Sequence, residues 1–242
     1  VTEQYMFDYC KKLTTLAKEL DSSRIIACAN MNQVEIANPL NSITDAVGQN
    51  LYFGWYYGKM QDYKTYLDEF HSQNPNMPIG ISEYGVDCNL HFHTETPTVR
   101  DYSEEFQALF HETVYPILES KTYLWGSFIW NMFDFGSAIR NEGDIKHKNC
   151  KGLVTYYRKI KKDAFYYYKA RWSNEPFVHI TGKRFQKRNA AQITIKIYSN
   201  LPQVTLLING KQTLSKTPQQ PCVFLFPDID LITDGQTKIQ AI

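Results

Sequence analysis

Four short apolar segments, separated by helical patterns, constrain the fold of this 242-residue chain more than any other feature. Parallel strands that are covered by helices on both faces read as nearly continuous hydrophobic runs. The expected strands lie at residues 24–31, 46–57, 77–85 and 123–133. Their alternation with helices predicts an α/β fold with a parallel sheet, and both doubly wound and (β/α)8 architectures fit this pattern.

Amphipathic helices are expected beside these strands. The first covers residues 5–20, where apolar side chains recur at steps of three and four, and Thr2 is its expected N-cap. A second helix is expected at residues 60–70, and a third begins after Ser103. Pro116 should kink the third helix or end it early, because proline lacks the N–H that a helix requires.

The pattern changes near Trp172, where helical periodicity gives way to alternation of apolar and polar residues. The alternation is clearest around Ile195, and Asn209 precedes a glycine as in a tight hairpin. We therefore expect a partial barrel domain at residues 1–172 and an all-β, immunoglobulin-like sandwich at 173–242. About 70 residues is short for such a sandwich, which has roughly 100, so truncation is consistent with this length.

The composition excludes several classes of partner. With 26 basic and 25 acidic side chains, the net charge of +1 gives no reason to expect nucleic acid binding. No apolar run of 18 residues predicts a membrane span, and five scattered cysteines form no disulfide framework. The 17 Tyr, 14 Phe and 4 Trp favour a flat ligand such as a sugar, although core packing explains aromatic residues equally well.

One loop contains metal-ligating residue types. Cys88, His91 and His93 lie close together in the sequence. A structural zinc site needs four ligands, usually with paired spacing, so we expect a solvated or pocket-rim loop here and no metal. We also expect no cofactor.

Polar side chains close three of the expected strands. They are Asn50 with Tyr52, Glu83, and Asn131 with Asp134. In barrel enzymes the catalytic residues lie at the carboxyl ends of several different strands. Glu83 is the most informative of these residues, because it ends an apolar run abruptly. The alternative is a structural carboxylate that caps a neighbouring helix or pairs with an arginine.

Three segments together resemble the catalytic domain of family 2 glycoside hydrolases, which include β-galactosidases, β-glucuronidases and β-mannosidases. They are NLYFGWYYG at residues 50–58, ISEYG at 81–85, and the block at 128–172 that contains SFIWNMFDF, RNEGD and KGLVTYYRKIKKDAFYYYKARW. The resemblance covers about 170 residues. It implies the C-terminal half of a (β/α)8 TIM barrel, with the four strands as the fifth to eighth.

The resemblance also implies a retaining mechanism with two carboxylates. Glu83 matches the family's nucleophile, which forms a covalent glycosyl-enzyme intermediate. The family's acid/base glutamate would lie upstream of Val1. We therefore expect this chain alone to lack hydrolytic activity, because general acid catalysis contributes about 10² to 10⁴-fold.

Five further positions match substrate-binding residues of the family. Tyr52 and Tyr56 match tyrosines that line the sugar pocket, and Tyr52 is the better candidate for a hydrogen bond to the nucleophile. Trp130 matches the tryptophan of the pocket wall. Asn149 and Lys151 match an Asn-x-Lys pair that reads the carboxylate of a glucuronide, although related β-galactosidases carry such a pair too. The alternatives are core packing for the aromatics and a solvated loop for the pair.

The resemblance predicts an exo-acting enzyme that hydrolyses terminal β-linked sugars. The amino-acid sequence of the last block favours a β-galactosidase, with β-glucuronidase or another family 2 β-glycosidase as the alternative. A non-catalytic carbohydrate-binding or scaffold protein is a further alternative from another class. A bacterial protein is expected, in the cytoplasm, in the periplasm or secreted. Open barrel edges predict either a homodimer or a loosely ordered first strand.

Overall fold

The computed structural model describes residues 4–232 and 235–242, so the predicted N-cap Thr2 lies outside the described residues. The chain forms two compact units. The first unit contains Val1–Val86 and Glu112–Met132, and the second contains Asp87–His111 and Phe133–Ile242. Each unit is a set of residues that contact mainly one another. The domain boundary expected at residue 172 stays a prediction.

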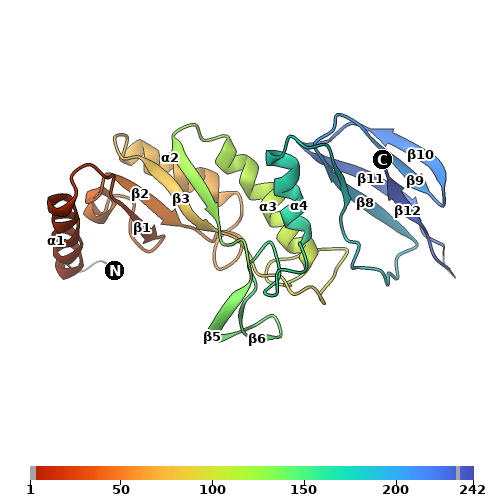
Figure 1. The fold of residues 1–242 in the computed structure, drawn as a ribbon, viewed down its shortest axis with the longest axis horizontal. Helices are drawn as coiled ribbons and strands as arrows, with labels where there is room; N and C mark the ends of the chain where they lie inside the picture. The colour runs from red at the N-terminus through yellow and green to blue at the C-terminus, as the bar shows by residue number, and fades with distance from the viewer. Residues whose placement is uncertain (1–3, 233–234) are drawn as a thin grey trace. The chain divides into compact units, whose positions relative to one another are not determined.

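A four-stranded parallel sheet forms the centre of the first unit. Its strands are β1 (Ala27–Met31), β2 (Ala46–Asn50), β3 (Ile79–Tyr84) and β4 (Leu124–Ile129). They lie side by side in chain order, and every neighbouring pair is parallel (Figure 1). The predicted parallel sheet is therefore confirmed.

The second strand is shorter than the sequence predicts. It ends at Asn50, and the chain then turns instead of extending to Tyr57. Gly54 has a φ of 77°, and its N–H donates to the carbonyl of Tyr57 at 2.8 Å. Positive φ suits glycine because it has no Cβ. This glycine allows the aromatic segment to fold into a compact loop after the carboxyl end of β2.

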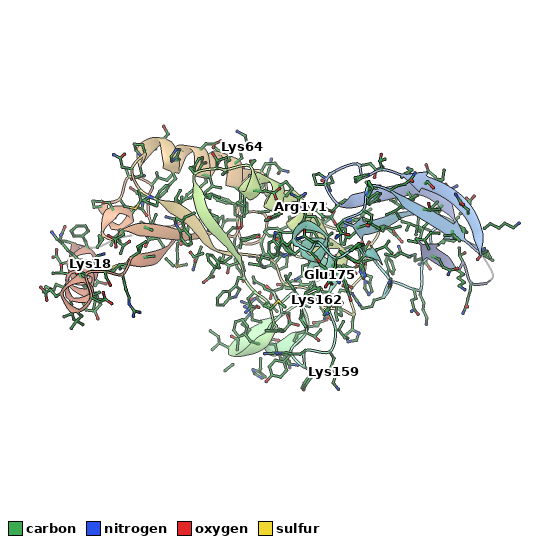
Figure 2. All side chains as sticks on the ribbon, turned by 45° about the horizontal axis from the view of Figure 1, so that its top comes forward. Lys18, Lys64, Lys159, Lys162, Arg171 and Glu175 are labelled. Atoms are coloured by element: carbon green, nitrogen blue, oxygen red, sulfur yellow. The ribbon has the colours of Figure 1, made fainter. Side chains whose placement is uncertain are left out.

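Two α-helices of the first unit differ in burial. The helix α2 (Asp62–Gln73) buries Tyr63, Leu67 and Phe70. The helix α1 (Gln4–Leu20) has no buried residue, so its predicted apolar face is exposed. Its Lys18, which is labelled in Figure 2, forms an ion pair of 2.7 Å with Asp45 of the loop before β2. A short 3₁₀ helix, η1, covers Pro39–Ser42.

The helix α3 (Glu104–Glu119) begins where the sequence predicts. The N–H of Phe106 donates to the Ser103 hydroxyl at 3.0 Å, which confirms the predicted cap. The helix continues three residues beyond Pro116 instead of ending early. One lost backbone hydrogen bond therefore does not terminate this helix.

A hairpin that the sequence analysis missed opens the second part of the second unit. It joins β5 (Phe135–Glu142) to β6 (Ile145–Asn149) as an antiparallel pair. Its two turn residues, Gly143 and Asp144, have φ values of 60° and 58°. Positive φ at both central positions is typical of a type I′ turn, so the Gly-Asp pair was the overlooked signal. The helix α4 (Asp163–Trp172) follows.

The remaining strands of the second unit form two three-stranded antiparallel sheets, with the orders β11-β8-β7 and β10-β9-β12. They are β7 (Val178–Ile180), β8 (Gln192–Ser199), β9 (Val204–Ile208), β10 (Lys211–Lys216), β11 (Val223–Asp230) and β12 (Ile239–Ala241). Side chains of both sheets, including Ile197, Leu206 and Phe224, share one hydrophobic core. The predicted antiparallel pattern is confirmed, whereas immunoglobulin-like topology stays a prediction.

Three further predictions concern association and environment. Within the described residues, no helix combines the length and the apolar character that a bilayer span requires. All five cysteines are free thiols. In the described sheet of the first unit, β1 and β4 are the edge strands. Self-association through such edges stays a prediction.

A steric contact at the end of β3 generates a stability prediction. A Cβ at Gly85 would lie 2.3 Å from the carbonyl oxygen of Trp130, a backbone atom that cannot rotate away. We expect Gly85→Ala to lower the free energy of unfolding by about 2 to 4 kcal/mol, because the two backbones must separate. Chemical denaturation measures this change. Gly136→Ala is the control, since no atom lies within 4 Å of its added Cβ, and equal effects would contradict the steric argument.

Candidate active site

Glu83 lies near the carboxyl end of β3, where it pairs in register with Asn50 of β2. Its carbonyl oxygen accepts the N–H of Leu51 at 2.9 Å. Its side chain is half-buried. Among the described residues, its carboxylate accepts a hydrogen bond from a tyrosine and neither caps a helix nor pairs with an arginine. The structural alternative for Glu83 therefore has no support in these contacts.

The tyrosine is Tyr52, whose hydroxyl donates to Oε2 of Glu83 at 2.6 Å. A hydroxyl and a carboxylate at this distance form a short, charge-assisted hydrogen bond. The contact predicted for Tyr52 is therefore present. Because Tyr52 holds one carboxylate oxygen, the orientation of the Glu83 side chain is fixed.

Tyr56 packs against this tyrosine. The ring centroids of Tyr52 and Tyr56 are 5.4 Å apart, with the rings edge to face at 63°. Tyr56 is more than one third exposed. An edge-to-face pair with one exposed member leaves an aromatic surface beside Glu83 that a ligand can contact. Its role in sugar binding stays a prediction.

Trp130 lies directly after β4 and is tied to the end of β3. Its N–H donates to the carbonyl of Tyr84 at 2.8 Å. The indole is partly exposed, so core packing does not account for the whole side chain. The close approach at Gly85 permits this arrangement. Contact of Trp130 with a sugar stays a prediction.

Asn149 and Lys151 belong to the second unit and are buried, so the solvated-loop alternative is wrong. The Asn149 side-chain oxygen accepts the N–H of Lys151 at 3.0 Å. The Lys151 ammonium, 1% exposed, pairs with Asp87. Asp87 also accepts hydrogen bonds of 3.0 Å from Arg140 and from the N–H of Cys150. Asp87 thus joins Lys151, Arg140 and the backbone of Cys150 in one buried cluster.

A second buried ion pair was missed by the sequence analysis. The Lys162 ammonium donates to Asp134 and to the carbonyl of Cys150, both at 2.9 Å, and to the carbonyl of Cys88 at 3.5 Å. Burial disfavours its charge, yet the negative groups around it raise the pKa of Lys162 overall. Lys162 is buried, whereas Lys159, which is labelled with it in Figure 2, is exposed. No local signal distinguishes these lysines, because both lie in one basic run.

The histidines of the loop after β3 have structural partners. Nδ1 of His93 lies 3.0 Å from Glu105, and its ring stacks on Phe185 with centroids 5.3 Å apart. Cys88 is buried, and burial raises the pKa of its thiol well above the ordinary value. Among the described residues, no three side chains of metal-ligating type converge on one point.

A small cavity lies within the second unit. Its volume is about 150 Å³, below the roughly 300 Å³ at which ligand pockets usually begin. By itself it is too small for a sugar with its aglycone. It is lined by Cys88, Asn89, Leu90, His91, Asp134, Ile145, Lys148, Cys150, Thr155, Tyr156 and Tyr157.

A parallel sheet with a tyrosine-bound carboxylate near a strand's carboxyl end is typical of α/β proteins, barrels among them, that carry functional groups there. The family described as glycosyl hydrolases family 2, TIM barrel domain, matches residues 2–176. The chain belongs to this family. The predicted family is therefore confirmed, and β1 to β4 lie within the residues that match its barrel domain.

Relatives of known structure or curated name are similar over most of the chain. A β-glucuronidase of Bacteroides fragilis is 37% identical over 209 residues, covering 84% of this chain and 30% of the relative. The structure of an FMN-binding β-glucuronidase from Facaelibacterium prausnitzii L2-6 is 40% identical with a TM-score of 0.91, covering 100% of this chain and 38% of that chain. A putative β-galactosidase from Bacteroides fragilis is 30% identical with a TM-score of 0.86, covering 96% and 37%.

The chain thus spans about a third of the length of these relatives. Two of the three are named β-glucuronidases, whereas the third is named a putative β-galactosidase, the activity that the sequence analysis placed first. Because one relative is named as FMN-binding, the expected absence of a cofactor stays a prediction.

The Lys162 ion pair generates a second stability prediction. We expect Lys162→Met to lower the free energy of unfolding by about 3 to 5 kcal/mol, because it leaves the buried Asp134 carboxylate without its cationic partner and removes one donor from two carbonyls. Denaturant titration measures the loss. Lys159→Met should stay within about 0.5 kcal/mol, since Lys159 is exposed. A loss below 1 kcal/mol for Lys162→Met would refute this view of the pair.

Proposed function

We propose that the protein containing this chain is a retaining β-glucuronidase in which Glu83 is the nucleophile. The observation that carries the proposal is the hydrogen bond of 2.6 Å from Tyr52 to Glu83 at the end of a parallel strand. Membership of glycoside hydrolase family 2 supports the reaction class. Exo-action on a terminal β-linked sugar is part of the proposal.

In the proposed mechanism, Glu83 attacks the anomeric carbon of the bound sugar. A bond forms between a carboxylate oxygen and that carbon while the glycosidic bond breaks, and the aglycone leaves with a proton from a separate acid. Water then attacks the anomeric carbon and gives its proton back to the separate acid, now a base, which releases the sugar and restores the Glu83 carboxylate. Tyr52 holds Oε2, so Oε1 is the oxygen available for attack.

Two observations support a glucuronide as the substrate. Two of the three relatives are named β-glucuronidases. In addition, Lys151 and Arg140 place two cationic groups on one carboxylate, Asp87, beside Asn149. We propose that Asn149 and Lys151 bind the sugar carboxylate. Tyr56 and Trp130 are proposed to contact the sugar ring.

A β-galactosidase is the second candidate. The putative β-galactosidase from Bacteroides fragilis, at 30% identity, supports it. A neutral galactoside carries no carboxylate for the Lys151 ammonium to bind. The two candidates therefore differ in whether the substrate carries a carboxylate, which the choice of substrate can test directly.

Substrate hydrolysis by the protein at its full natural length separates these candidates. We expect nitrophenyl β-glucuronide to be cleaved with a kcat/KM at least about a hundredfold above that of nitrophenyl β-galactoside, because charge-assisted contacts to the carboxylate are lost with the neutral sugar. A higher kcat/KM for the galactoside would reverse the assignment. If both substrates bind and neither is cleaved, the non-catalytic carbohydrate-binding alternative is correct.

The nucleophile has its own test. We expect Glu83→Gln to lower kcat by at least about 10³-fold, because an amide cannot form the glycosyl ester. The control is Glu69→Gln, an exposed carboxyl of α2 bonded to Gln73, which should retain wild-type activity. A 2-fluoro-glucuronide with a good leaving group should label Glu83, as located by peptide mass spectrometry. A label on another residue would contradict the assignment.

A further inference from the structure

Tyr57 makes an unusual contact with the backbone of the site. Its hydroxyl oxygen accepts the N–H of Tyr52 at 2.9 Å. The preceding N–H, that of Leu51, still donates to the carbonyl of Glu83 on β3. The strand β2 ends at Asn50, and Leu51 makes the last backbone hydrogen bond to β3. The Tyr57 hydroxyl therefore accepts the first N–H beyond this pairing, that of Tyr52.

The Tyr57 side chain is itself held in place. Its carbonyl accepts the N–H of Gly54 at 2.8 Å. Its ring packs edge to face on Phe53, with centroids 4.9 Å apart, and Phe53 packs in turn on Tyr63 of α2. Burial raises the pKa of Tyr57, which keeps the phenol neutral and its oxygen able to accept. The acceptor is therefore rigid because α2 supports it.

The Tyr52 backbone is fixed from its other side as well. Its carbonyl accepts the N–H groups of Trp55 and Tyr56, both at 3.1 Å. With the Tyr57 contact, both polar backbone groups of Tyr52 are occupied. Fixing the backbone fixes the direction of the Cα–Cβ bond and restricts where the hydroxyl can reach. That hydroxyl is the group that contacts Glu83.

We propose that Tyr57 is a positioning residue for catalysis. Through the backbone N–H of Tyr52, it aims the Tyr52 hydroxyl at Oε2 of Glu83. The inference rests on the proposed function of Glu83. It assigns a role to the phenol oxygen of Tyr57 that is separate from the packing of its ring.

The test removes that oxygen alone. In the protein at its full natural length, we expect Tyr57→Phe to lower kcat about tenfold on the substrate that the wild type cleaves, because one hydrogen bond is lost and the Tyr52 hydroxyl is misaligned. KM should change less than twofold. In a Tyr52→Phe background, the same substitution should change kcat less than twofold, because its effect passes through the Tyr52 hydroxyl.

Hydrogen exchange provides a readout that does not need activity. In Tyr57→Phe, the amide of Tyr52 should exchange at least about tenfold faster, whereas the amide of Leu51 should keep its protection through Glu83. The matched control is Tyr66→Phe. It removes a hydroxyl that donates to Gln49, from a ring that also packs on Phe53. The control should leave both the Tyr52 amide and kcat unchanged.

Three results would overturn the inference. They are unchanged exchange at Tyr52, unchanged kcat in Tyr57→Phe, or an equal loss of kcat with and without the Tyr52 hydroxyl. A wild-type protein that cleaves no glycoside refutes the proposed function instead. In that case the exchange measurement still decides whether Tyr57 holds the Tyr52 backbone.

Discussion

The parallel backbone ladder between β2 and β3 is the constraint on which the candidate site depends. It sets Asn50 opposite Glu83 and extends one residue further, to the N–H of Leu51. A register shift of one residue would turn the Glu83 side chain to the other face of the sheet. The contact with Tyr52 therefore requires this register. The aromatic loop after β2 supplies the Tyr52 hydroxyl that binds the Glu83 carboxylate.

The fold was predictable wherever one periodicity extended over a whole element. Apolar runs identified β1 to β4, and strict alternation identified β8. The loop after Asn50 was not predictable in this way, because its apolar aromatic residues read as a continuing strand while Gly54 turns the chain. The hairpin of β5 and β6 was missed for a related reason. Its signal is two turn residues rather than a hydrophobic pattern.

The same difference between local and long-range signals separates the site residues that were predictable from those that were not. Glu83 was identifiable because an ionisable residue at the end of an apolar strand is conspicuous, and resemblance added Tyr52. Asp87 and Lys162 were not identifiable. Their burial depends on partners up to 74 positions away in the sequence, and nothing near them in the chain reveals a partner. Charge burial is a property of the assembled structure, whereas periodicity is a property of the segment.

The Lys162 ammonium has a consequence for how this protein can evolve. It joins Cys88, Asp134 just before β5, and Cys150 just after β6. Insertions at these three anchor points would separate groups that share one donor. The loop beyond Cys88 is free of that constraint until Ser103 begins α3. A change in the length of that loop therefore leaves the three contacts of the Lys162 ammonium in place.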